Sequence, residues 1–212
     1  MAPGAARTEP PCIEVATQEA LDAALRDGRV PVCVGWGSFV VRDRAEVWAR
    51  ESAQVTAFDS AAVHAAGLAS VAASDVARVY ASGRALVTAH RQTKVEARES
   101  AKVEAYGRAE VDAYDSADVA ASNSTRIRAH DAATVEAYGS AQVCALDLSH
   151  VVAHHKARVE ARDGARVEAH GEVTIEAFDS ARVVAWGDVS VIDHGPGTLV
   201  TRARHAPEEE EL

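Results

Sequence analysis

Apolar and polar residues alternate through most of the chain in units of eight. Residues 45–188 divide into eighteen consecutive octads without an insertion or deletion. The third place of each octad is Val or Ile and the fifth is Ala throughout, whereas the second and fourth places are mostly polar. Because residues two apart lie on the same face of a strand, places 1, 3 and 5 predict a short strand with one buried face.

The last three places of each octad carry turn residues. They read Phe-Asp-Ser at residues 58–60 and 178–180 and Tyr-Gly-Ser at residues 138–140. Gly, Asp, Asn and Ser all favour turns. A helix is disfavoured because an eight-residue period drifts by about 80° per octad around a helix of 3.6 residues per turn, so no apolar stripe forms. Each octad therefore predicts a strand followed by a turn.

The seventh places alternate between residues that tolerate a positive φ and aspartate. The first set is Gly107, Asn123, Gly139, His155, Gly171 and Gly187, and the second is Asp115, Asp131, Asp147, Asp163 and Asp179. Two octads thus form one coil with two different corners, and we expect each Asp to bond the backbone amides of its own turn. Gly67 and Gly83 fall in the opposite phase. This predicts that the corners exchange roles near Arg91 and Glu99.

The predicted fold is all-β: a flattened two-sheet β-solenoid with 16-residue coils and a short N-terminal α/β cap. One octad cannot close a coil because its strand alone spans about 16 Å, whereas a strand, a corner, a returning strand and a second corner can. About ten coils spaced about 4.8 Å apart make a rod of roughly 45–50 Å. The competing fold, an antiparallel meander of twenty strands, would leave a broad Val/Ala face in water.

The ends of the chain depart from the octad pattern. We divide the sequence into an N-terminal tail (1–12), a capping segment (13–36), the solenoid (37–200) and an acidic C-terminal tail (201–212). In the capping segment we expect a strand over 13–15 and a helix over 18–26, with Thr17 as its N-cap and Asp27-Gly28 as its end. We expect a last strand over 199–201. Because the C-terminal cover is modest, end-to-end contact between copies stays an open alternative.

Composition narrows the class of protein. The net charge of −10 disfavours general nucleic-acid binding, which depends on neutralising phosphates. Three cysteines without a CxxC pair make neither a disulfide framework nor a zinc motif. The sequence has no run of 18 apolar residues and no recognisable signal peptide, so we expect a cytoplasmic protein. Abundant Ala, Val and Arg suggest an actinobacterial source.

The phrases TVEAYGSAQVCA, KVEAYGRAEVDA and IEAFDSARVVA resemble the Ala/Val octapeptide repeats of the YGSASVTA type in actinobacterial and actinophage proteins. EVATQEALDAALRDGRVPV is similar to the leader that precedes such repeats. A looser similarity links the chain to ice-nucleation proteins, whose sixteen-residue coils contain a YGS turn. Those proteins carry Thr-x-Thr on the outward places, where this chain has Lys94/Glu96, Glu110/Asp112 and Arg126/Arg128. The resemblance implies a fold rather than an activity.

Two rows of outward side chains are predicted on one sheet. The second places carry Arg78, Lys94, Glu110, Arg126, Gln142 and Arg158, and the fourth places carry Tyr80, Glu96, Asp112, Arg128, Cys144 and Glu160. Side chains on adjacent strands lie close enough to interact, and many neighbours here differ in sign. We interpret this face as a solvated surface with ion pairs.

The aspartate corner is the strongest candidate site. Asp115, Asp131, Asp147, Asp163 and Asp179 would stack about 4.8 Å apart, where like charges repel unless each is hydrogen-bonded or a cation lies among them. Calcium prefers such ligands. Because the Gly-Gly-x-Gly-x-Asp motif of calcium-binding nonapeptide repeats is absent, we favour capping of the turn over metal binding.

The opposite corner predicts a ladder of rings. It consists of Phe58, His90, Tyr106, Tyr138, His154, His170 and Trp186, interrupted by Ser74 and Ser122. We consider three interpretations in falling order: plain stacking along the edge, a strip for self-association or a protein partner, and a transition-metal site at His154 and His170 with His150 and His155 nearby.

No catalytic motif is recognised. GxSxG, HExxH, P-loop and dinucleotide fingerprints are absent, and no fixed base is evident beside Cys144. We therefore predict a non-enzymatic scaffold without a cofactor that self-associates or docks a protein. The alternatives are a ligand-array binder for ice or cations and, third, an acidic mimic of duplex DNA.

Overall fold

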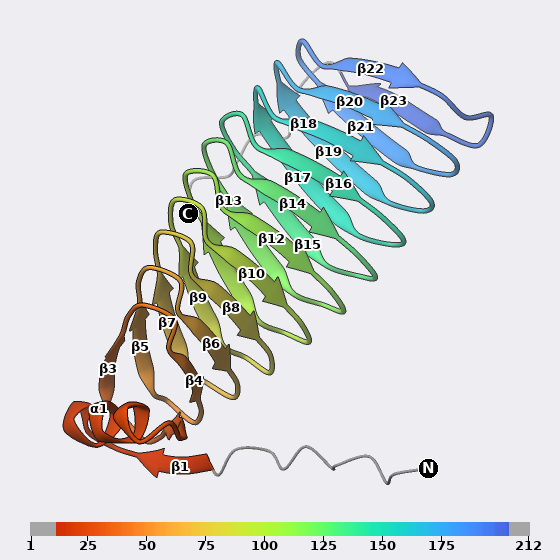
Figure 1. The fold of residues 1–212 in the computed structure, drawn as a ribbon. Helices are drawn as coiled ribbons and strands as arrows, with labels where there is room; N and C mark the ends of the chain where they lie inside the picture. Colours follow the sequence, from red (N-terminus) through yellow and green to blue (C-terminus); the bar gives the residue numbers. More distant parts are fainter. Residues whose placement is uncertain (1–11, 204–212) are drawn as a thin grey trace, which may run out of the picture.

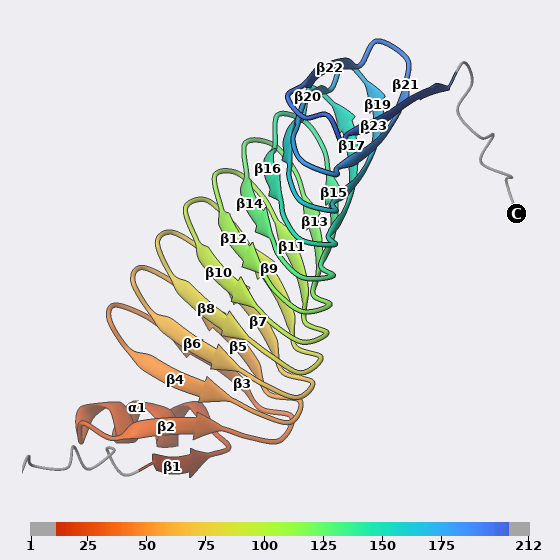
Figure 2. The ribbon, with the colours of Figure 1, turned by 90° about the vertical axis from the view of Figure 1, so that its right-hand side faces the viewer.

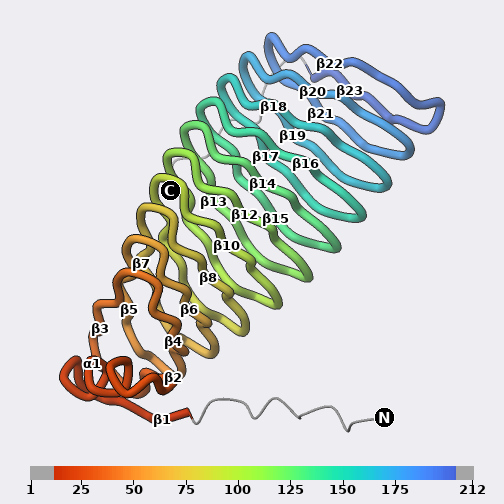
Figure 3. Tube along the Cα trace, viewed as in Figure 1, coloured from red at the N-terminus to blue at the C-terminus, as the bar shows by residue number. Residues whose placement is uncertain are grey.

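The computed structural model describes residues 12–203. The chain forms a stack of coils, and each coil contributes strands to two sheets of parallel strands (Figure 1). The first strand pairs with the second, and every later strand pairs with the strand two places along the chain. Through the octads of residues 45–188 the register advances by sixteen residues, as in Val95 opposite Val111 and Val111 opposite Ile127. Every strand pairing is parallel, which confirms the β-solenoid and excludes the antiparallel meander. The Cα trace follows each coil as a flattened loop (Figure 3).

Within residues 12–203 the two sheets hold 12 and 11 strands. The first sheet, sheet A, contains β1 (Cys12–Val15), β2 (Val30–Cys33), β4 (Glu46–Ala49), β6 (Ala62–Ala65), β8 (Arg78–Ala81), β10 (Lys94–Ala97), β12 (Glu110–Ala113), β14 (Arg126–Ala129), β16 (Gln142–Ala145), β18 (Arg158–Ala161), β20 (Thr174–Ala177) and β22 (Ser190–Asp193). The second sheet, sheet B, contains β3 (Ser38–Val41), β5 (Gln54–Ala57), β7 (Ser70–Ala73), β9 (Leu86–Ala89), β11 (Lys102–Ala105), β13 (Asp118–Ala121), β15 (Thr134–Ala137), β17 (His150–His155), β19 (Arg166–Gly171), β21 (Arg182–Trp186) and β23 (Leu199–Ala203). The strands beyond the expected ten per sheet are β1, β2 and β23.

The core is a thin layer of Val and Ala between the sheets. Val111 is 1% exposed, and its neighbours Ala109 and Ala113 are fully buried. First-place Thr93, Thr125 and Ser149 are also fully buried, and the Thr93 hydroxyl donates to the His90 carbonyl at 2.6 Å. Places 1, 3 and 5 of the octad thus face inward, as the alternation predicts.

The backbone turns in the same way at both corners. Asp115 has φ 58° and Gly107 has φ 72°, so the left-handed conformation is not confined to the Gly corner as expected. Asp and Asn adopt this conformation at lower cost than other residues with a Cβ, because their short side chains can hydrogen-bond locally. The predicted exchange of roles is confirmed: Asp43, Asp59 and Asp75 belong to the corner that later carries Gly107.

Helix α1 (Gln18–Arg26) covers the first coil (Figure 2). The Thr17 hydroxyl accepts from the Ala20 amide at 3.3 Å, the helix ends at Asp27, and Leu21 is fully buried against the core. These features confirm the predicted cap. The Gln18 side chain adds to it by accepting from the Val40 amide at 2.7 Å and donating to the Val40 carbonyl at 3.0 Å. This side-chain amide occupies the free edge of β3 as a neighbouring strand would.

The last coil differs from the others at its inward positions. Asp193 pairs in register with Ala177, and Arg202 pairs with Ala185, so two charged residues replace the fifth-place alanines. Arg202 donates to the Val189 carbonyl at 3.1 Å, which links the two sheets. The predicted last strand is confirmed as β23, although its register has slipped by one residue so that Leu199 lies opposite Arg182.

The predicted tails lie almost entirely outside the described residues, at 1–11 and 204–212. Within the described part of the chain, α1 is the one helix, and no helix is long and apolar enough to cross a membrane.

Candidate functional site

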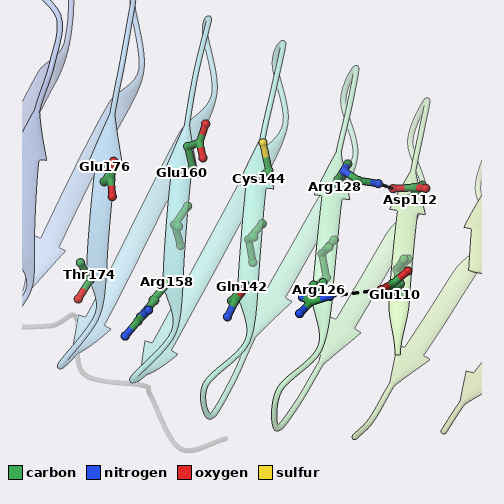
Figure 4. A pocket seen from close by; sticks show the side chains of 14 residues that line it. Glu110, Asp112, Arg126, Arg128, Gln142, Cys144, Arg158, Glu160, Thr174 and Glu176 are labelled. Carbon is green, nitrogen blue, oxygen red and sulfur yellow. Dashed lines mark hydrogen bonds and ion pairs between the residues drawn. The ribbon is translucent and has the colours of Figure 1, made fainter. Parts of the chain in front are cut away.

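The outer face of sheet A carries the two predicted rows of side chains. Glu110 binds Lys94 at 2.9 Å and Arg126 at 3.4 Å, and Arg128 binds Asp112 at 3.0 Å. Figure 4 shows the pairs Arg126–Glu110 and Arg128–Asp112. Side chains on adjacent coils form ion pairs along each row, as expected. Such exposed pairs contribute little to stability individually. Their arrangement matters more for the electrostatic field that they leave.

The two rows carry different charge. The fourth-place carboxylates of Glu96 and Glu160 pair with Arg98 and Arg162 at 2.7 Å and 2.6 Å. The second-place row is mostly basic, and Arg78 and Arg158 form no ion pair with any residue in 12–203. Unneutralised positive charge therefore collects on the side of sheet A that adjoins the corner after sheet B.

A groove follows this basic side. It has a volume of about 990 Å³, and it lies between the second-place row of sheet A and the eighth-place residues of the preceding corner. We call it the basic groove; its charged lining residues are Arg44, Arg78, Lys94, Arg108 and Arg126, with Glu46 and Glu110. The carboxylate of Glu46 is bound to His64 at 2.9 Å. The predicted second-place row includes Arg78, Lys94, Glu110 and Arg126 but not Glu46 or the eighth-place Arg44 and Arg108.

Cys144 lies in a shallower depression of about 370 Å³ on the same face. Burial raises the pKa of the Cys144 thiol, and the negative charge of Glu160 raises it further. A reactive cysteine needs a lowered pKa. The environment of Cys144 therefore gives no support to nucleophilic chemistry.

The aspartate corner forms a ladder of hydrogen bonds between coils. Asp131 accepts from the Asp115 amide at 3.1 Å, and Asp147 accepts from the Asp131 amide at 3.1 Å. The expectation that each Asp caps its own turn is wrong, because each caps the turn one coil earlier. Glutamate does the same where Glu99 accepts from the Gly83 amide at 2.6 Å. The left-handed residue directs its amide towards the next coil, where the carboxylate lies.

The metal interpretations receive no support from this geometry. Among residues 12–203, no three His, Cys, Asp or Glu side chains are grouped so that they could hold a metal ion. The carboxylates of the Asp corner are engaged by backbone amides instead. At the other corner, the His154 and His170 rings stack with centroids 5.1 Å apart and planes 12° from parallel.

The ring ladder is a set of separate stacks. Ser74 and Ser122 divide it into Phe58, the pair His90–Tyr106 with centroids 5.2 Å apart, and a four-ring stack. In that stack Tyr138, His154, His170 and Trp186 follow one another with centroids 4.5–5.1 Å apart. All four rings are half-buried. The predicted stacking is confirmed, and the ladder's role as an interaction strip stays a prediction.

Three further stacks were missed in the sequence. Trp48, His64 and Tyr80 stack on the face of sheet A, and the pairs Tyr114–His130 and Phe178–His194 lie on the aspartate corner. Their common signal is aromatic or His side chains sixteen residues apart at one place of the octad. Stacked rings thus occur on several sides of the rod, which weakens the idea that one ring ladder marks a unique site.

The first four strands of sheet B carry an uncharged outer face, which sequence reasoning also missed. We call this surface the neutral patch; its outward residues on β3, β5, β7 and β9 are Ser38, Val40, Gln54, Thr56, Ser70, Ala72, Leu86 and Thr88. Leu86 is 50% exposed and Val40 43% exposed. Trp36 and Leu68, 85% and 55% exposed, precede β3 and β7 on the adjoining corner. Charge returns at Lys102 and Glu104 on β11.

Comparisons with protein-family models, curated proteins and solved structures found no match for this chain. The surfaces described above are therefore the basis for a functional argument.

Proposed function

We propose that this chain is a non-enzymatic structural rod that self-associates through the neutral patch on sheet B. The observation that carries the proposal is the patch itself: eight outward side chains on four adjacent strands include no charged residue. A quarter of the residues in the chain are charged (25%), so an uncharged stretch of this extent is unusual for a face left in water.

The exposed apolar side chains at the patch support its role in association. Of the large hydrophobic residues that are exposed, Trp36, Leu68 and Leu86 are each at least half exposed and lie on or beside it. Contiguous apolar surface bordered by polar residues marks interaction sites more often than solvated faces. Depletion of charge and enrichment of aromatic residues are typical of the central part of protein interfaces.

Electrostatics favours this face for contact between copies. Two molecules that each carry a net charge of −10 repel one another wherever their acidic surfaces meet. Contact through the neutral patch brings no like charges directly together. A two-fold arrangement places the same patch on both partners, and two flat sheets pack face to face about 10 Å apart.

The construction of the rod suits a scaffold. Each internal strand is hydrogen-bonded along both edges, and side-chain carboxylates tie successive corners together. Because each coil is stable only when it is stacked on its neighbours, the repeat array behaves as one stiff body. Such a body holds its surfaces at fixed spacing, which is the physical requirement for an assembly unit.

The test is the oligomeric state at several protein concentrations, measured by sedimentation equilibrium. We expect a concentration-dependent dimer for the unchanged chain and a monomer for Leu86→Glu. The matched control is Leu148→Glu, since Leu148 is 73% exposed but lies outside the patch. A strict monomer at high concentration contradicts self-association, and equal behaviour of the two variants contradicts the patch as its site.

The alternative array-binding functions rank lower. An ice-binding face needs a regular array of small hydroxyl groups, whereas the fourth-place row of the neutral patch mixes Thr56 and Thr88 with Val40 and Ala72. A mimic of duplex DNA needs regular negative charge, whereas Arg and Lys alternate with acids on sheet A. We would nevertheless measure thermal hysteresis, since a positive result would replace the scaffold proposal.

A further inference from the structure

We infer that the basic groove on sheet A binds an extended acidic polypeptide segment. This site does not overlap the neutral patch, because the patch lies on sheet B and the groove lies along sheet A and the corner before it. The inference is therefore independent of self-association, and either proposal can fail while the other stands.

The groove carries an excess of positive charge on an acidic protein. Its lining has five basic residues, Arg44, Arg78, Lys94, Arg108 and Arg126, against Glu46 and Glu110. Both acids are already engaged, Glu46 by His64 and Glu110 by two cations. Lys156 and Arg158 extend the same two rows towards the C-terminal end. The basic groove is therefore locally positive although the chain has a net charge of −10.

Three of the arginines have no anionic partner within residues 12–203. Arg44, Arg78 and Arg108 form no ion pair with a described residue, although most other cations on this face are paired. The positive field also reaches Glu110, where the hydrogen bond from Lys94 and then the charges of Lys94, Arg126 and Arg128 lower its pKa. The groove thus offers charge that a ligand can neutralise.

The shape of the groove fits a long, thin ligand. Basic residues lie on both sides of a trough that runs along the stack, with second-place Arg78 and Lys94 on one side and eighth-place Arg108 on the other. Neighbouring side chains in one row are about 4.8 Å apart. An extended peptide advances about 3.3 Å per residue, so acidic side chains can meet cations of both rows. Ser60, Gln92, Ser124 and Gln142 in the lining can bond its backbone.

The surroundings favour a polypeptide over a nucleic acid. Binding of single-stranded nucleic acid relies on aromatic side chains that stack on the bases, and no aromatic residue within 12–203 lines the groove. Glu208–Glu211 of this sequence are four consecutive glutamates and are an example of the kind of segment that the groove would bind.

The test is fluorescence anisotropy with the full chain and a labelled peptide of about ten glutamates, which can span about six coil spacings when extended. We expect binding that weakens as salt is added. The double variant Arg78→Glu/Arg108→Glu should weaken binding by about tenfold or more, since charge reversal places like charges together. Neither arginine makes an ion pair with a described residue, so the variant should fold, and its circular dichroism and melting temperature verify this.

The matched control is Arg166→Glu/Arg182→Glu, which reverses two exposed arginines on the outer face of sheet B. We expect it to bind the peptide nearly as tightly as the unchanged chain. An equal loss in both variants would show a general charge effect and overturn the site. The absence of binding at low salt, or tighter binding of a single-stranded oligonucleotide of equal charge, would overturn the acidic polypeptide as ligand.

Discussion

The carboxylate of Asp131 accepts a hydrogen bond from the backbone amide of Asp115, one coil earlier, at 3.1 Å. Both residues are in the left-handed conformation, with φ 55° and 58°. The side chain of one corner residue therefore stabilises the left-handed backbone of the corner residue one coil earlier, and this conformation is not confined to glycine. This relationship explains why an acidic residue can occupy a position that would otherwise favour Gly.

Substitutions at Asp131 should separate the hydrogen bond from the backbone conformation. We expect Asp131→Ala to lower the free energy of unfolding by about 1–2 kcal/mol, since it loses the acceptor and the short polar side chain that lowers the cost of a positive φ. Asp131→Asn should cost less, because its amide oxygen still accepts and Asn tolerates this conformation. Urea denaturation followed by circular dichroism measures the order, which an Ala variant as stable as the Asn variant would contradict.

The separation of the two sheets is tested at a buried alanine. Ala113 is fully buried, and the fifth place is Ala in all eighteen octads, so the sheets have no room for a larger side chain. We expect Ala113→Val to destabilise the rod by about 1–3 kcal/mol through overpacking. Ala120→Val is the matched control, because Ala120 lies outward on β13 and should change stability by no more than about 0.5 kcal/mol. Equal effects on the urea midpoint would contradict a tightly packed core.

The strands, the sixteen-residue coil and the cap could be predicted because each depends on local pattern. The third-place Val and fifth-place Ala define an inward face in every octad, and Thr17 and Asp27 mark the helix ends by residue type alone. The direction of the Asp131 carboxylate could not be predicted in this way. It depends on which way the Asp115 amide points along the stack, and an octad read by itself does not contain that information.

The surfaces show a second limit of sequence reasoning. The neutral patch could have been predicted, since Val40, Thr56 and Thr88 occupy the same place in alternate octads. The sequence analysis considers the outward rows of sheet A only. The register slip that places Leu199 opposite Arg182 was not readable, because residues 194–197 break the period and leave the next pairing undetermined. Arg202 consequently could not be assigned to an inward position beforehand.

Acid should weaken the contact between adjacent coils at Glu110. The hydrogen bond from Lys94 lowers the pKa of Glu110 below its ordinary value of 4.5, so the folded state binds this proton less readily than the unfolded state. The stabilisation is present above pH 4.5 and is lost as the pH falls through the lower pKa of the folded state. We expect Glu110→Gln to lower the melting temperature at neutral pH and to approach the unchanged chain in acid. A difference that is constant with pH would contradict this origin, and high salt should reduce it.

The C-terminal end should resist stacking because of Asp193 and Arg202. Within the described residues, β22 pairs only with β20 and β23 only with β21, so both sheets end in an open edge. A second molecule stacked on this end would have to bury the two charged side chains that replace inward alanines. Burying an unpaired charge costs on the order of several kcal/mol. Inward-pointing charge is a known protection of sheet edges.

We therefore expect Asp193→Ala/Arg202→Ala to form end-to-end assemblies at concentrations where the unchanged chain does not. Light scattering and negative-stain microscopy measure the length of the particles. Adding Leu86→Glu to the double variant separates these assemblies from association through the neutral patch, and particles no longer than those of the unchanged chain would show that the two charges do not protect this end.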